Sequence, residues 1–60
     1  MNHKWIPCKE KLPDQNGCYL VSVENDYERK YSKTAWFSNG HWFARQKVLA
    51  WMYLPEPYKP

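Results

Sequence analysis

Thr34-Ala35-Trp36-Phe37-Ser38-Asn39-Gly40-His41-Trp42-Phe43-Ala44 is the stretch that decides the fold of this 60-residue chain. The pair Asn39-Gly40 favours a two-residue type I′ turn, because both central positions of that turn require a positive φ. Segments rich in aromatic residues flank the turn, which predicts a β-hairpin. The turn also fixes the register, and it predicts these cross-strand pairs: Ser38 with His41, Phe37 with Trp42, and Trp36 with Phe43.

Two further strands are expected outside the hairpin. Cys18-Tyr19-Leu20-Val21-Ser22-Val23 is rich in β-formers, and it follows a strong turn signal at Asp14-Gln15-Asn16-Gly17. The last strand, Val48 to Tyr53, follows a short basic bend at Arg45-Gln46-Lys47. No convincing helical pattern is present. The sequence therefore predicts an all-β fold: a small three- to four-stranded antiparallel meander with an extended N-terminal arm.

The polar segment 24–33 is compatible with three conformations. It suits a long mobile hairpin loop, or two strands that extend to a turn near Asn25-Asp26. Because Tyr27 and Tyr31 lie four residues apart, a single helical turn also fits. The residues alone do not choose among these.

The chain is short enough to form one domain, 1–60, close to the lower size limit for folding alone. All of its prolines lie at the two ends, and none occurs between Pro13 and Pro55. Because proline lacks the N–H that a sheet requires, the sheet is expected within 18–54. Residues 1–17 are expected to form an extended arm with turns, and 55–60 a Pro-rich tail.

Aromatic residues are unusually abundant, with four Trp, five Tyr and two Phe. Side chains alternate between the faces of a strand, so both faces of the expected sheet are apolar. In the last strand, Val48, Ala50 and Met52 are expected on one face, and Leu49 and Trp51 on the other. A small sheet with one core normally has a polar face, so the second face needs a cover. The candidates are the N-terminal arm with Trp5 and Ile6 as plugs, a second copy of the chain, or a ligand.

Charge and cysteine content limit the classes of function. The net charge of +3 is modest, and Glu24, Asp26 and Glu28 interrupt the basic residues, which argues against duplex DNA as a target. Two cysteines, Cys8 and Cys18, do not form a disulfide framework and lack zinc spacing. We therefore expect free thiols and no metal or cofactor. Without a signal peptide or an apolar span, a cytoplasmic location with no membrane partner is expected.

Binding is better supported than catalysis. No nucleophile is recognisably paired with a base, no Gly-rich phosphate loop is present, and a non-enzyme is expected. Aromatic and cationic residues alternate through the middle of the chain, which suits an anionic, planar ligand, because bases stack on rings and cations bind phosphates. The candidate ligand-binding residues are Tyr31, Lys33, Trp36, Trp42, Phe43, Arg45 and Lys47.

Three motifs carry a resemblance to a known family. The chain opens with Trp5-Ile6-Pro7, continues with Leu12-Pro13, and ends with Trp51-Met52-Tyr53-Leu54-Pro55-Glu56-Pro57. This frame resembles domain-of-unknown-function family 551, small proteins frequent in phage and prophage genomes, although Tyr53 and Tyr58 stand where the family pattern has proline. The resemblance implies a genomic setting and no reaction.

The residues and the resemblance together lead to one functional hypothesis. We expect a non-enzymatic phage accessory protein, a homo-oligomer that counters a host defence by sequestering a nucleotide-type ligand. The alternative is a protein–protein inhibitor that docks an aromatic patch onto a host or defence enzyme, since aromatic anchors dominate such interfaces.

Overall fold

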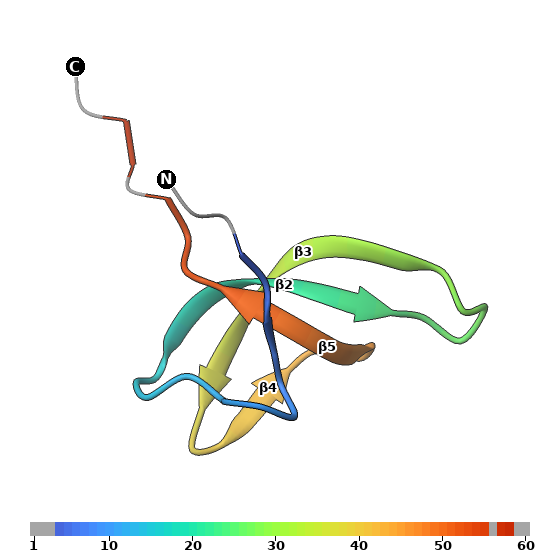
Figure 1. Ribbon diagram of the computed structural model, residues 1–60, viewed down its shortest axis with the longest axis horizontal. Coiled ribbons are helices and arrows are strands. Elements are labelled where there is room, and N and C mark those ends of the chain that lie inside the picture. The colour runs from blue at the N-terminus through green and yellow to red at the C-terminus, as the bar shows by residue number, and fades with distance from the viewer. Residues whose placement is uncertain (1–3, 56, 59–60) are drawn as a thin grey trace.

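A computed structural model describes residues 4–55, 57 and 58, which form a single antiparallel sheet without a helix (Figure 1). The strands are β1 (Ile6–Pro7), β2 (Gly17–Glu24), β3 (Lys30–Ser38), β4 (His41–Phe43) and β5 (Lys47–Met52). The all-β prediction is confirmed. The sheet has five strands rather than three or four, because two residues of the predicted arm form β1.

The β3–β4 hairpin has the predicted turn and register. Asn39 and Gly40 have φ angles of 52° and 83°, as a type I′ turn requires. Phe37 lies opposite Trp42, and the pairs on either side follow the same register. The local residues thus account for the turn type and the register, and the side-chain oxygen of Asn16 also accepts a hydrogen bond from the N–H of Asn39 at 3.1 Å.

The polar segment between β2 and β3 takes the second of its three predicted conformations, in which both strands extend to a tight turn. The N–H of Asn25 donates to the carbonyl of Arg29, and the N–H of Glu28 donates to the carbonyl of Asn25, both at 3.0 Å. The side-chain oxygen of Asn25 also accepts from the N–H groups of Tyr27 and Arg29, at 2.9 and 3.0 Å. Glu28 has a φ of 62°, in a position that glycine usually occupies in such loops.

The strand order is β1-β5-β2-β3-β4, so β5 does not continue the meander beside β4. After β4, the chain crosses through residues 44–46 and β5 pairs with β2 instead. Strand length gives a physical reason: β4 has three residues, whereas β2 offers eight to the six of β5. The longer pairing provides hydrogen-bond partners for more backbone N–H and C=O groups.

A β-bulge interrupts the pairing of β5 with β2. Ser22 lies opposite Ala50, but Val23 lies opposite Val48, so Leu49 is the extra residue. The bulge puts Val48 on the same face as Trp51, where it packs against the core. The predicted face of Val48 is wrong, because strict alternation does not continue through a bulge.

We call the face that carries the core the inner face. Its buried side chains come from β2, β3 and β5, and they are Tyr19, Val21, Val23, Ala35, Phe37 and Trp51. The arm packs on this core face and does not cover the opposite face, for which it was one of the predicted covers. Ile6 packs against the core, whereas Trp5 is 39% exposed and is not a plug.

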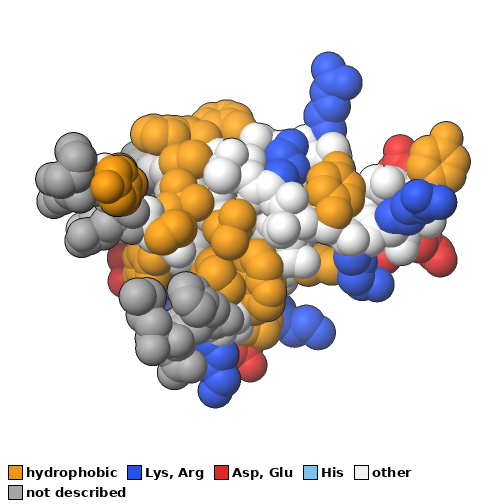
Figure 2. Space-filling model, turned by 90° about the horizontal axis from the view of Figure 1, so that it is seen from above, with side chains coloured by type: hydrophobic (Ala, Val, Ile, Leu, Met, Phe, Trp, Pro, Cys, Tyr) orange, Lys and Arg blue, Asp and Glu red, His pale blue; other side chains and the backbone are white. Residues whose placement is uncertain are grey.

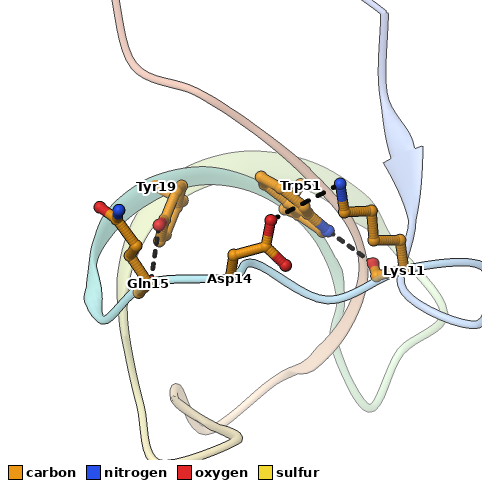
Figure 3. Close-up of polar contacts among 5 residues, drawn as sticks. All are labelled: Lys11, Asp14, Gln15, Tyr19 and Trp51. Atoms are coloured by element: carbon orange, nitrogen blue, oxygen red, sulfur yellow. Dashed lines mark hydrogen bonds and ion pairs between the residues drawn. The ribbon is translucent and has the colours of Figure 1, made fainter.

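Two hydrogen bonds attach the arm to the inner face (Figure 3). The indole N–H of Trp51 donates to the carbonyl of Lys11 at 2.8 Å, and the hydroxyl of Tyr19 donates to the carbonyl of Gln15 at 2.7 Å. An ion pair between Lys11 and Asp14, at 3.8 Å, lies beside them on the surface. The buried rings thus obtain partners for their polar atoms from the arm.

The opposite, outer face of the sheet is partly open. Trp36 and Phe43 are cross-strand partners there, and their side chains are 51% and 65% exposed. Cys18 lies beside Trp36 on β2 and is also exposed. Elsewhere, hydrophobic side chains gather in a band near the termini, whereas charged side chains cluster towards the β2–β3 turn (Figure 2). The predicted Pro-rich tail lies partly outside the described residues, and those described in it, Pro55, Pro57 and Tyr58, are exposed.

Candidate ligand-binding site

An open depression of about 540 Å³ lies along the crossing segment between β4 and β5. This volume lies within the range of about 300–1,000 Å³ that small-ligand pockets span, but the depression is shallow rather than enclosed. Its lining residues are Lys33, Trp42, Phe43, Ala44, Arg45 and Gln46. All but Lys33 are consecutive, because the chain itself forms this wall as it crosses from β4 to β5.

Trp42 is the rigid part of the depression. It lies opposite Phe37 and therefore belongs to the inner face. Its ring packs at 4.8 Å from the ring of Phe37 and edge-on to Tyr19 at 6.0 Å, measured between centroids. These contacts hold the indole in one orientation, so a ligand that stacks on it meets a preformed surface.

The indole N–H of Trp42 is buried and makes no hydrogen bond of good geometry. It lies close to the Cys8 thiol in the arm. Burial raises the pKa of Cys8, and the nearby indole N–H lowers it by a smaller amount. Cys8 is thus held as a neutral thiol, and it contributes to the attachment of the arm rather than to reactive chemistry.

The cations of the depression come from two elements. Lys33 lies on the inner face of β3, opposite Val21, and its Nζ lies 3.4 Å from Oε1 of Gln46. Arg45 is exposed in the crossing segment. No carboxylate occurs among the lining residues, and Glu24 is engaged by Lys30 at 3.6 Å. The depression therefore favours an anion.

The structure brings together four of the seven predicted ligand-binding residues: Lys33, Trp42, Phe43 and Arg45. The other three do not line the depression. Trp36 is the neighbour of Phe43 on the outer face, Tyr31 lies opposite Val23, and Lys47 lies opposite Glu24 at the start of β5.

Two lining residues were not predicted, Ala44 and Gln46. Gln46 lies within the predicted basic bend, and its polar side chain gave no reason to prefer it over its cationic neighbours. What places both of them is the crossing from β4 to β5, which depends on long-range strand pairing. No local signal marks such a crossing.

The described part of the chain shows no group of three or more His, Cys, Asp or Glu side chains that could hold a metal ion. Cys8 and Cys18 are free thiols, as predicted. Over residues 4–55, 57 and 58, no helix has the length and apolar character to cross a membrane.

The fold and the depression define a small antiparallel β protein with an open, aromatic and cationic surface. The chain belongs to the family described as protein of unknown function (DUF551), which matches residues 4–59. The resemblance seen in the sequence motifs is thereby confirmed over nearly the whole chain. No curated protein and no solved structure matches the chain.

Proposed function

We propose that this chain is a non-enzymatic binding protein that takes a planar, anionic ligand of nucleotide type in the depression beside Trp42. The observation that carries the proposal is the combination of lining groups: two aromatic rings and two cations, with no acidic side chain among them. Base–aromatic stacking contributes about 1–3 kcal/mol per base. Arg45 supplies a planar fork for phosphate oxygens, and Lys33 supplies a point charge.

The same lining argues for binding rather than turnover. A hydrolytic or transfer reaction needs a nucleophile or a general base within hydrogen-bond reach of the reacting atom. The residues that line the depression include no carboxylate, imidazole, hydroxyl or thiol, and Lys33 has no partner among them that would activate its amine. The lining side chains hold and orient an anion, and the shallow shape leaves the ligand in contact with water, which catalysis usually excludes.

The family resemblance gives this activity its setting. In a phage-infected cell, a small and abundant binder lowers the free concentration of a nucleotide signal by mass action alone. Counter-defence by sequestration requires affinity and copy number, and no reaction. We propose this role in the host cytoplasm.

Calorimetry with a panel of linear and cyclic mono- and dinucleotides tests the proposal. Lys33→Gln is expected to weaken binding about 10-fold or more, because a hydrogen bond to a charged group is worth about 1.5–3 kcal/mol. Lys47→Gln is the matched control: it removes the same charge at a position that does not line the depression. Absence of binding by the whole panel, or equal losses in the two variants, would contradict the proposal.

A second candidate function is inhibition of a host or defence enzyme through the outer face. The exposed pair Trp36 and Phe43 favours it, because exposed aromatic side chains are frequent interface anchors. Capture of a stoichiometric partner from host lysate, lost with Trp36→Ala and retained with Lys47→Gln, would support this function. A chain that binds a nucleotide and captures no protein supports the first.

A further inference from the structure

β3 is much longer than the strand that covers its outer edge. It runs over nine residues, whereas β4 pairs only with Trp36–Ser38. Along Lys30–Ala35, β3 has β2 on one side and no strand of the described chain on the other. In Figure 1 this part of β3 forms the upper right margin of the sheet, above β2.

The register of the β3–β4 hairpin identifies which backbone groups point to this free edge. A two-residue turn closes on a hydrogen-bonded pair, here Ser38 with His41, and such pairs recur at every second residue. Trp36 is therefore the last residue of β3 bonded to β4. By the same alternation, the N–H and C=O groups of Thr34, Ser32 and Lys30 face the free edge.

We propose that a second copy of this chain pairs antiparallel with this edge, around a two-fold axis at Ser32. The pairing joins the two sheets into one and places Tyr31 of the second copy opposite Lys33, at the depression. The ligand-binding role of that contact rests on the proposed function, whereas the pairing itself does not.

The register follows from the extent of the free segment. Its edge-facing residues are centred on Ser32, so a two-fold axis there pairs Ser32 with its own copy and Lys30 with Thr34. The adjacent register would bring Lys33 opposite Lys33 of the other copy, and like charges directly opposite are destabilising. In the proposed register Lys33 meets the ring of Tyr31, which attracts a cation.

This arrangement changes the composition of the depression. Tyr31 and Lys33 lie opposite Val23 and Val21, two buried residues, so both side chains lie on the inner face. Within one chain, Tyr31 does not line the depression. Because directly opposed residues share a face, Tyr31 of the second copy lies beside Lys33 and adds an aromatic ring at the rim.

Charge modulates the pairing without preventing it. Each chain carries a net charge of +3, so two copies repel each other at long range. At the edge itself, Lys30 already pairs with Glu24 at 3.6 Å. Screening by salt is therefore expected to strengthen the self-association.

Sedimentation equilibrium of the full chain without ligand tests the pairing. The wild-type chain is expected to dimerise, more tightly as salt is raised. Ser32→Pro is expected to weaken the dimer about 10-fold or more, because it removes a central N–H from both copies. That N–H does not face β2, so the fold is retained, as circular dichroism can verify. Ser32→Ala keeps the N–H and is expected to dimerise as the wild type does. A wild-type monomer, or a dimer that Ser32→Pro leaves unchanged, would overturn the proposal.

A pair of charge variants tests the register. Tyr31→Lys is expected to weaken the dimer, because two cations then lie opposite each other, whereas Tyr31→Glu is expected to retain it or strengthen it. Equal effects of the two variants would refute this register. If no nucleotide binds and the dimer still depends on Ser32, the proposed function fails and the pairing stands. If a nucleotide binds wild type and Ser32→Pro equally, the contribution of Tyr31 to the site is wrong.

Discussion

Trp51→Phe is the substitution whose effect follows most directly from the structure. Trp51 is fully buried, and its ring lies within 5.2 Å of the rings of Tyr19 and Tyr53, measured between centroids. Beyond the pairing of β1 with β5, it also attaches the following part of the N-terminal arm, because its indole N–H donates to the carbonyl of Lys11. Phenylalanine keeps an aromatic ring at this position and removes the donor.

Two losses make up the expected change in the free energy of unfolding. The hydrogen bond to Lys11 contributes about 0.5–1.5 kcal/mol net. The smaller ring removes apolar contact from a site that cannot fully collapse, which costs a further ~1–2 kcal/mol. The sum is roughly 1.5–3.5 kcal/mol, a large part of the ~3–5 kcal/mol that a core of this size supplies. The melting temperature is expected to fall by about 10–20 °C.

Urea and thermal unfolding followed by far-UV circular dichroism measure this change. Trp36→Phe is the matched control, because the Trp36 ring is half exposed and makes no ring hydrogen bond in the described structure. Its expected effect is within about 0.5 kcal/mol. Hydrogen exchange should also show lost protection in residues 8–16 of Trp51→Phe alone. Equal destabilisation by the two variants would refute the role assigned to Trp51.

Four further predictions concern turns and thiols. Glu28→Gly is expected to stabilise the chain by about 0.5–1 kcal/mol in urea unfolding, because glycine relieves the positive φ of 62°; Glu28→Ala should not. Gly40→Ala is expected to cost about 1 kcal/mol or more by the same assay, through its φ of 83° alone, since a Cβ there meets no atom within 4 Å. Iodoacetamide should alkylate Cys18 faster than Cys8, as mass spectrometry can follow, because Cys18 is exposed and burial raises the pKa of Cys8. Because the pKa of Cys8 is higher in the folded chain than in the unfolded chain, the thiol of the unfolded chain loses its proton at the lower pH. The free energy of unfolding is therefore expected to fall as the pH rises from the ordinary thiol pKa to the raised pKa of folded Cys8. Cys8→Ser is expected to remove that fall.

Sequence reasoning succeeded where the deciding interactions are local. Asn39-Gly40 determines the turn, the register and the faces of β3 and β4 without reference to any other segment. The turn at 25–29 is also formed by local residues, but the sequence lacks the glycine that usually marks such a turn. Such loops usually carry glycine at the position with positive φ, and this chain has Glu28 there.

Long-range pairing was not predictable in the same way. The partner of β5 depends on which of β2 and β4 offers the longer edge, and hydrophobic periodicity within each strand does not decide which one pairs with β5. The bulge at Leu49 then reversed the face of Val48. Periodicity cannot reveal such an insertion, since one extra residue leaves the composition of a strand unchanged.

The same difficulty explains the composition of the candidate site. Composition pointed correctly to aromatic and cationic residues, but the crossing of 44–46 decides which of them meet. Tyr31 of β3 and Lys47 of β5 lie opposite Val23 and Glu24 of β2, and neither lines the depression within one chain. A sequence interpreted as a simple meander does not give the crossing that decides this.

The two residues of β4 that line the depression have different consequences for any binding experiment. Trp42 faces inward and packs on Phe37 and Tyr19, so Trp42→Ala removes core contacts and destabilises the chain whether or not a ligand binds there. A loss of ligand binding in Trp42→Ala would therefore not show whether the ligand binds in the depression. Phe43 is the next residue and faces the other way, 65% exposed at the rim. Phe43→Ala leaves the core intact, so a loss of ligand binding in that variant can be assigned to the depression itself.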